Sequence, residues 1–334
     1  MIYERQLKNN CCLLSIIRSN RTLSFYSDSL MENNITKKSW LLLTLLGLIW
    51  GSTFMIIELA LDGITPFWLA AARISIAAVI TNMIWLFSSR QLFLTQSKNW
   101  PTLILSGVFA TAAPFIALSW GQQYVTSAFA GISMASVALL ILPLSYFFVV
   151  SEKITTFTVL GMFFGFFGVV ILLGPEVFLA SNETKEAYGR LACLFATFCY
   201  ATSAVLTKRL PAIDPIGLAA VSLTSGAMFV IPSAWLIEGS PPSVSKQTLI
   251  YLLILGLFPT AAATFLRIII IRTAGPVFMT LTNFQVPLWS VFFSIILLNE
   301  PFKISMIIAL ALILIGLAIS QMSEIKKLVK INSL

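Results

Sequence analysis

Long apolar runs separated by short polar links make up most of this chain. Ten runs are long enough, at roughly 20 residues each, to cross the hydrocarbon core of a bilayer as helices. Helices are expected because lipid offers no partners to open backbone groups. We therefore predict an all-α, polytopic membrane protein with ten transmembrane helices. The predicted spans lie near 39–59, 66–87, 100–119, 126–149, 155–174, 189–208, 215–237, 248–270, 275–298 and 303–322.

Two heptads within this pattern are nearly identical. Residues 107–113 (GVFATAA) and 256–262 (GLFPTAA) agree at five of seven positions, at an offset of 149. Pro66 and Pro215 keep the same offset, and Trp50 corresponds to Tyr200 at an offset of 150. Matches that extend beyond the heptads indicate a tandem duplication.

The duplication predicts two five-helix repeats, at 39–174 and 188–322. Because five crossings are an odd number, the second copy must be inverted relative to the first. Inverted repeats are typical of secondary transporters, whose substrate site lies at the repeat interface.

Composition and charge agree with a membrane location. Hydrophobic residues make up 58% of the chain and charged residues only 10%, against roughly 25% charged in soluble domains. With both termini in the cytoplasm, inner segments hold sixteen Lys and Arg and outer segments four, Arg267 and Arg272 being counted on the inner side. This distribution follows the positive-inside rule. The basic residues lie in links and tails, so no nucleic-acid partner is predicted.

The two ends of the chain are expected to lie outside the repeats. We expect residues 1–38 to form a cytoplasmic tail, of which residues 1–30 are dispensable, and residues 323–334 to form a basic cytoplasmic tail. The chain contains no histidine and four cysteines without metal-ligand spacing. We therefore predict no metal, no cofactor and no disulfide framework.

Several motifs resemble those of a known family. They are Trp50 to Phe54 (WGSTF), Pro66 to Arg73, and the pairs Ser151-Glu152 and Asn299-Glu300 after the fourth and ninth spans. In order and spacing they resemble the drug/metabolite transporter superfamily, in particular its EamA-type members. The resemblance implies an inner-membrane exporter or exchanger of small metabolites, amino acids among them. The chain departs from the family at Glu58, where members often carry a basic residue.

Arg73 is the sharpest individual candidate. It lies within the second span, where an ionised group costs at least ~2.5 kcal/mol unless it faces a cavity or a partner. One interpretation is that Arg73 binds an anionic group of the substrate. The other is a structural pair with Glu58 or with helix-end carbonyls.

Glu58, near the outer end of the first span, is the one candidate for ion coupling. An exposed helix-end charge is the favoured alternative. The absence of a deeper carboxylate argues for facilitated or exchange transport.

Further candidates for substrate binding are polar or aromatic residues at mid-depth, which could instead join helices to one another. They are Trp50, Ser52, Thr53, Ser133, Ser136, Tyr200, Asn283, Gln285 and Trp289. Pro259 and Pro287 interrupt apolar runs and are candidate hinges. Gly161 and Gly165 form a GxxxG motif that fits either a homodimer interface or packing within one chain.

We therefore expect a secondary transporter that moves a small amino-acid-like, anionic or zwitterionic metabolite by alternating access, as an exporter or exchanger. Its predicted partners are the small-molecule substrate, the lipid bilayer and, through the GxxxG motif, a second copy of the chain. An importer of the same fold, an intramembrane enzyme and a channel are the alternatives. The lack of histidine and of paired carboxylates within the membrane argues against the enzyme.

Overall fold

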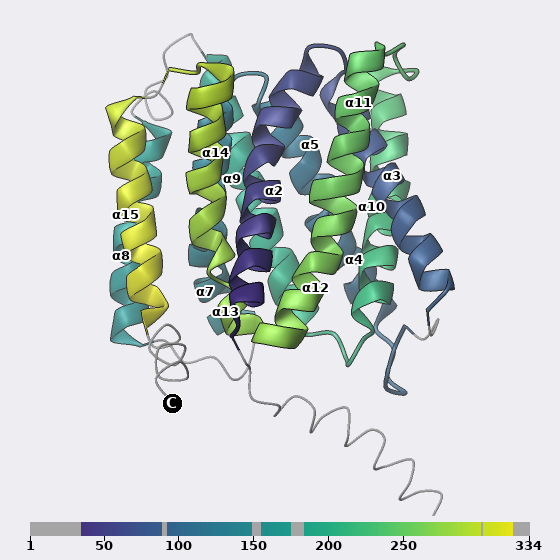
Figure 1. Ribbon diagram of the computed structural model, residues 1–334, viewed down its shortest axis with the longest axis horizontal. Coiled ribbons are helices and arrows are strands. Elements are labelled where there is room, and N and C mark those ends of the chain that lie inside the picture. The colour runs from purple at the N-terminus through teal and green to yellow at the C-terminus, as the bar shows by residue number, and fades with distance from the viewer. Residues whose placement is uncertain (1–34, 89–91, 149–154, 175–183, 302, 323–334) are drawn as a thin grey trace, which may run out of the picture.

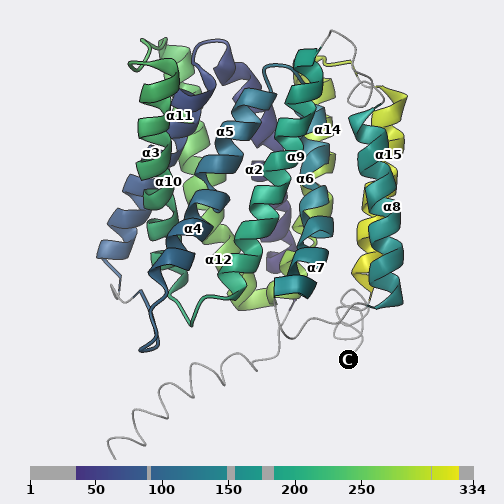
Figure 2. The ribbon, with the colours of Figure 1, turned by 180° about the vertical axis from the view of Figure 1, so that it is seen from behind.

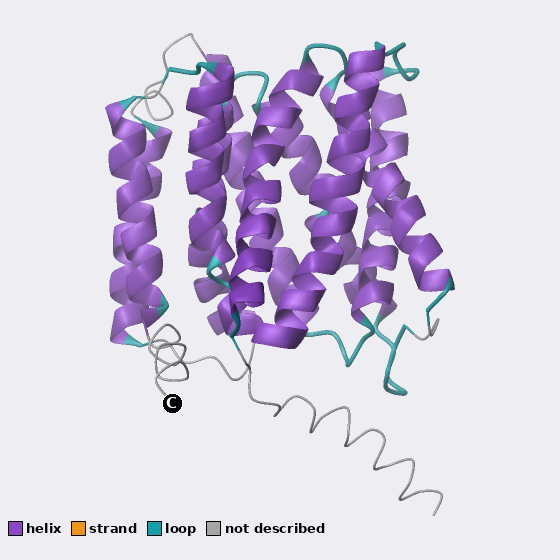
Figure 3. Ribbon diagram, viewed as in Figure 1, coloured by secondary structure: helices purple, strands orange, loops and turns teal. Residues whose placement is uncertain are grey.

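The computed structural model describes residues 35–88, 92–148, 155–174, 184–301 and 303–322 (Figure 1). Within these ranges the regular structure is helical, apart from one isolated bridge between Phe93 and Ile213 (Figure 3). The predicted all-α class is confirmed. The expectations for residues 1–30 and for the tail 323–334 lie outside the described residues.

The first half of the chain forms five spans. Its helices are α2 (Lys37–Leu61), α3 (Pro66–Leu86), α4 (Trp100–Ala110), α5 (Ala112–Gly121), α6 (Ser127–Met134), α7 (Ser136–Phe148) and α8 (Thr156–Leu173). Helices α4 and α5 together form one span, and so do α6 and α7.

The second half repeats this order. Its helices are α9 (Thr184–Lys208), α10 (Pro215–Glu238), α11 (Lys246–Leu255), the π-helix η3 (Gly256–Ala262), α12 (Ala263–Ala274), α13 (Pro276–Met279), α14 (Thr282–Leu298) and α15 (Ile304–Ser320). Eight spans in the described chain are long and apolar enough to cross a membrane, and α14 and α15 are shorter apolar helices. Together they correspond to the ten predicted spans.

Local sequence explains where many of these helices begin. Side-chain oxygens at N-caps accept hydrogen bonds from backbone N–H groups of the first turn, which otherwise lack partners. The capping residues are Thr36, Asn99, Thr126, Thr155, Asp214 and Ser245. Proline at the start of α3 and α10 adds a backbone angle that already suits a helix.

The two halves pack reciprocally. Helix α2 contacts α14, α11 and α12, and its counterpart α9 contacts α7, α4 and α5. The pairs α3–α10 and α8–α15 join equivalent helices across the halves. Because α2 begins at the lower end of the bundle and α9 at the upper end, the halves are inverted (Figures 1 and 2). The arrangement is the one that a two-fold axis in the membrane plane produces.

Helices α8 and α15 stand side by side at one edge of the bundle (Figures 1 and 2). Their contact is built on glycines: a Cβ added to Gly316 would lie 2.9 Å from the Gly165 Cα, and one added to Gly168 would lie 2.9 Å from the Ala309 carbonyl oxygen. The Gly161 backbone carbonyl also faces Gly316. The GxxxG motif therefore packs helices within one chain, and the homodimer stays a prediction.

In both repeated heptads the backbone departs from a regular α-helix. In the first half, Thr111 separates α4 from α5 with φ −132° and ψ −72°. In the second half, the heptad forms η3, which contains Pro259. Proline removes a backbone donor, and single-turn π segments are frequent at functional sites. Helix α14, by contrast, continues through Pro287.

Candidate functional site

A buried arginine lies at the contact between the halves. Arg73 of α3 is 4% exposed, and its Nε donates a hydrogen bond of 2.8 Å to Thr260 Oγ1 in η3. The Thr260 hydroxyl in turn donates to the Leu255 carbonyl, also at 2.8 Å. The Thr260 hydroxyl oxygen thus accepts from the Arg73 guanidinium, and its O–H donates to a backbone carbonyl of the same span. These two hydrogen bonds fix the orientation of the Thr260 side chain.

Aromatic rings complete the surroundings of Arg73. The guanidinium carbon lies 3.9 Å from the centre of the Phe115 ring of α5. The Tyr200 ring of α9 lies near the Phe115 ring, with ring centres 6.5 Å apart. A ring face attracts a cation, and the attraction is stronger where water is excluded. Phe115 therefore stabilises the arginine without neutralising its charge.

Trp50 of α2 joins the same cluster through η3. Its Nε1 donates to the Pro259 carbonyl at 3.2 Å. The cluster of Trp50, Arg73, Phe115, Tyr200 and Thr260, called the Arg73 cluster below, therefore draws on five spans from both halves. Trp50 and Tyr200 occupy corresponding positions in the two repeats, so each half of the chain contributes one of this pair to the Arg73 cluster.

The partners of Arg73 leave part of its guanidinium free. Among the described residues, Thr260 is its one hydrogen-bond partner and no salt bridge reaches it. Glu58, the alternative partner suggested by the sequence, interacts instead with Gln122, Glu300 and Asp62. The two terminal nitrogens are consequently available for a bidentate contact, the geometry that suits a carboxylate.

A glycine allows η3 to lie close to α3 beside Arg73. A Cβ at Gly256 would lie 2.6 Å from Ile76 Cγ2 and 3.3 Å from the Arg73 carbonyl oxygen. In the first half, a Cβ at Gly107 would lie 2.7 Å from the Cα of Ser222, the residue that corresponds to Arg73. The close packing is therefore repeated in both halves, whereas the cation occurs in one.

The serine and threonine candidates mostly satisfy their own helices. Ser52 and Thr53 both donate to the Ile49 carbonyl, at 3.0 and 3.1 Å. Ser133 donates to the Ala130 carbonyl at 2.7 Å. The buried Ser136 hydroxyl has no partner among the described residues. No described contact joins these hydroxyls to the Arg73 cluster.

The candidates of α14 lie against α2. A Cβ at Gly47 would lie 2.8 Å from Gln285 Cβ, and Gln285 Oε1 is buried without a partner among the described residues. Trp289 packs beside Gly51 and stacks on Phe293 with ring centres 6.2 Å apart. Asn283 is half-buried near the start of α14. None of the three has a described contact with the Arg73 cluster.

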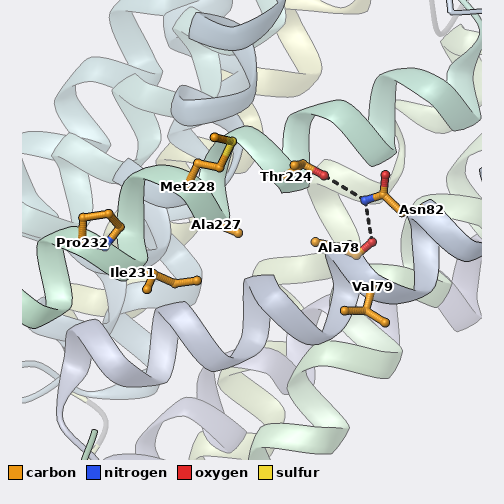
Figure 4. Close-up of a pocket in the computed structure, with 8 residues that line it drawn as sticks. All are labelled: Ala78, Val79, Asn82, Thr224, Ala227, Met228, Ile231 and Pro232. Atoms are coloured by element: carbon orange, nitrogen blue, oxygen red, sulfur yellow. Dashed lines mark hydrogen bonds between the residues drawn. The ribbon is translucent and has the colours of Figure 1, made fainter. Parts of the chain in front are cut away.

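A separate groove of about 560 Å³ lies between α3 and α10 (Figure 4). Its lining includes the exposed apolar side chains of Val79 and Met228. At one end, Asn82 Nδ2 donates to Thr224 Oγ1 at 2.8 Å and to the Ala78 carbonyl at 2.8 Å. Exposed apolar side chains on a membrane helix are suited to contact with lipid. None of the residues that line the groove belongs to the Arg73 cluster, so the two are distinct.

Several residues of the site were not singled out from the sequence. Thr260 and Phe115 each lie within an apolar run, and only the packing shows which way they face. The sequence did hold one signal for Thr260, because the repeated heptads share a threonine at that position, Thr111 in the first copy. Arg267, counted as an inner-side charge, lies inside the span Lys246–Ala274.

Comparison with known proteins supports a transporter. The model of the EamA-like transporter family matches residues 37–174 and 187–322. A protein of Bacillus subtilis (strain 168) named "Uncharacterized transporter YoaV" is 24% identical over 81% of this chain and 92% of its own length. An "Uncharacterized transporter" of Archaeoglobus fulgidus is 29% identical over 80% of this chain and 91% of its own.

A solved crystal structure shares the fold at 19% identity, with a TM-score of 0.60 over 87% of this chain and 99% of the other. The family match covers both halves of the helix bundle and almost all of the described residues. This chain belongs to the EamA-like transporter family and is a multi-pass membrane transporter.

Proposed function

We propose that this protein is a secondary carrier that moves a small anionic or zwitterionic metabolite across the cytoplasmic membrane by alternating access. An amino-acid-like solute, exported or exchanged, fits best. The observation that carries this proposal is the buried Arg73 guanidinium, held by Thr260 and Phe115 with its terminal nitrogens uncommitted. A cation within a membrane span is costly unless a function uses it.

The position of Arg73 supports alternating access. Its hydrogen bond to Thr260 crosses from the first half of the chain to the second. In carriers built from inverted repeats, movement of one repeat against the other exposes the shared site to each side in turn. A solute bound at Arg73 would lie at the surface where the two halves move.

The distribution of Lys and Arg favours cytoplasmic termini, as in the sequence analysis. With that orientation, α2 and α9 begin on opposite sides of the membrane and the Arg73 cluster lies between them. Export or exchange follows from the resemblance to EamA-type members, and import is the alternative that a direction assay separates.

The test begins with a ligand screen on the purified protein. Anionic, zwitterionic and cationic metabolites of similar size are compared by the thermal stabilisation each confers, since a ligand at 100 times its Kd adds about 2.7 kcal/mol of stability. Compounds that stabilise the protein then enter a counterflow assay in proteoliposomes. We expect saturable uptake of labelled carboxylate that unlabelled compound inside the vesicle accelerates. Linear uptake without acceleration would indicate a channel and overturn the carrier.

A further inference from the structure

A second arginine lies within the membrane, in the same span as η3. Arg267 belongs to α12, seven residues after Thr260 and seven before the end of the helix at Ala274. At 1.5 Å per residue, its backbone lies about 10 Å below the Arg73–Thr260 hydrogen bond along the helix axis. Because the proposed orientation places the lower end of α12 in the cytoplasm (Figure 1), Arg267 lies between that surface and the Arg73 cluster.

Arg267 occupies the buried face of its helix and is nevertheless exposed. Residues three, four and seven positions away share a face with it; they are Ala263, Ile270 and Ala274, each at most 1% exposed. Ile269, on the opposite side of α12, is 47% exposed and faces outward. Arg267 itself is exposed, although protein atoms surround its guanidinium. An exposed side chain within a buried stripe faces an opening inside the bundle rather than lipid.

The equivalent position in the first half of the chain is closed. Leu118 of α5 corresponds to Arg267 at the offset of 149 and is 3% exposed. It belongs to a core cluster that includes Phe54 of α2 and Cys193 of α9. The repeat therefore places this position inside the bundle in both halves, packed in the first half and open in the second.

The packing around α5 and α12 differs in the same sense. Helix α5 packs closely on α9 and α3, whereas α12 packs more loosely on the equivalent helices α2 and α10. At the upper end, Gln122 Nε2 also donates to the Phe54 carbonyl at 2.8 Å, which joins the end of α5 to α2. Ile271 holds the position equivalent to Gln122, and its side chain cannot make such a bond. The bundle is therefore closed near α5 and open near α12, where Arg267 lies.

The charge of Arg267 is not neutralised by any residue that the structure describes. Among those residues the side chain makes no hydrogen bond or salt bridge, and no charged group acts on it. A cation in a membrane span is costly without a partner, and water in an internal opening lowers that cost while leaving the charge available. A charge in a cleft with apolar walls raises the local concentration of ions of the opposite sign.

We propose that Arg267 is an anion-binding residue of the cytoplasmic entrance, where it attracts the anionic group of the substrate before that group reaches Arg73. This inference deepens the proposed carrier function and rests on it. Residues 261–266, between Thr260 and Arg267, carry no charge, so the solute passes directly from one cation to the other. Arg267 acts through its charge alone, whereas Arg73 is held in a fixed orientation by Thr260 and Phe115.

Thiol labelling tests the anion site without a substrate. In a background with the four native cysteines replaced, the half-buried Ile271, one turn from Arg267, is changed to cysteine. Inside-out membrane vesicles are then treated with anionic and cationic thiosulfonates of similar size. We expect the anionic reagent to react faster, with a rate ratio that falls about tenfold in Arg267→Gln and is kept in Arg267→Lys. The ratio cancels any change in the reactivity of the thiol itself.

Ile269→Cys, on the outward side of α12, is the matched control and should react with neither reagent. A rate ratio at Ile271→Cys that Arg267→Gln leaves unchanged would overturn the anion site. Equal labelling, or equal lack of labelling, of the two cysteines would do the same. A ratio that depends on Arg267 in phosphatidylcholine proteoliposomes, but no longer when phosphatidylglycerol is added, would assign Arg267 to a lipid phosphate instead of a solute.

Transport tests the entrance role separately, with a carboxylate solute found by counterflow. We expect Arg267→Gln to lower kcat/KM about tenfold and Arg267→Lys to keep the wild-type value. Arg272→Gln, in the last turn of α12, is the control and should transport normally. A wild-type kcat/KM in Arg267→Gln would contradict the entrance role. Absence of counterflow by the wild type would overturn the carrier function, whereas the labelling ratio decides the anion site independently.

Discussion

The Nε of Arg73 and the Oγ1 of Thr260 are 2.8 Å apart, although 187 positions separate the two residues in the chain. The bond joins α3 of the first half to η3 of the second, within the repeated heptad that marks the duplication. A cation in the membrane is thereby oriented by the one part of the described bundle that forms a π-helix. In transporters, irregular helices commonly position groups at the substrate site, which is the role that we propose for η3 and Arg73.

Loss of the Thr260 hydroxyl should weaken substrate binding by releasing Arg73. We expect Thr260→Val to raise the Kd about tenfold, because a hydrogen bond to a charged group contributes roughly 1.5–3 kcal/mol and 1.4 kcal/mol corresponds to tenfold. The matched control is Thr264→Val, since Thr264 donates to the Thr260 carbonyl of its own helix. Equal affinities of the two variants, measured by ligand-induced thermal stabilisation, would show that Thr260 does not position Arg73.

A large side chain in place of Gly316 should push α15 away from α8. We expect Gly316→Leu to lower the Tm in detergent while the oligomeric state stays unchanged, because a side chain there meets the backbone of Gly161 and Gly165 in the same chain. Ala311→Leu, on an exposed face of α15, is the control and should leave the Tm within error. If Gly316→Leu instead dissociates a dimer at unchanged Tm, the motif serves contacts between chains.

The hydrogen bond between Asn82 and Thr224 should contribute little, although it lies among apolar residues (Figure 4). Interhelical hydrogen bonds in membranes average about 0.6 kcal/mol in double-mutant cycles. We expect the cycle built from Asn82→Ala and Thr224→Ala to give a coupling energy of that size. A coupling above about 2 kcal/mol would indicate that the pair holds α3 against α10 more strongly than a typical membrane hydrogen bond.

The orientation of the bundle can be tested by labelling. In a background with the four native cysteines replaced, single cysteines at Lys98 and Lys246 are exposed to a membrane-impermeant reagent in intact cells. We expect Lys246→Cys, at the start of α11, to react from outside and Lys98→Cys, just before α4, to react only after lysis. Labelling of both from the same side would contradict the inverted arrangement.

The sequence predicted the spans well because bilayer thickness sets their length. Nine of the ten predicted spans end within two residues of the last residue of the helix that the structure describes, and the eighth ends four residues before Ala274. Pattern alone did not predict the break at Thr111 or the π-helix around Pro259. Both depend on how the heptads pack against α10 and α3 in three dimensions.

The candidate site was predicted in part. Arg73 stood out because a charge in an apolar run needs a partner, and Trp50 and Tyr200 stood out because the repeat aligns them. Phe115 did not, because an aromatic residue in an apolar span gives no signal of the side it faces. The alternative pairing of Arg73 with Glu58 seemed open from sequence, and the packing places the two residues in different polar sites.

Counterflow by an Arg73 variant tests the central claim, that Arg73 binds the transported solute. Wild type, Arg73→Ala and Arg73→Lys are reconstituted, with Arg272→Ala in the last turn of α12 as the matched control. We expect Arg73→Ala to fall to the level of empty liposomes and Arg73→Lys to keep a small fraction, since lysine lacks the bidentate fork. Arg272→Ala should transport normally. Wild-type counterflow by a folded Arg73→Ala would contradict the account.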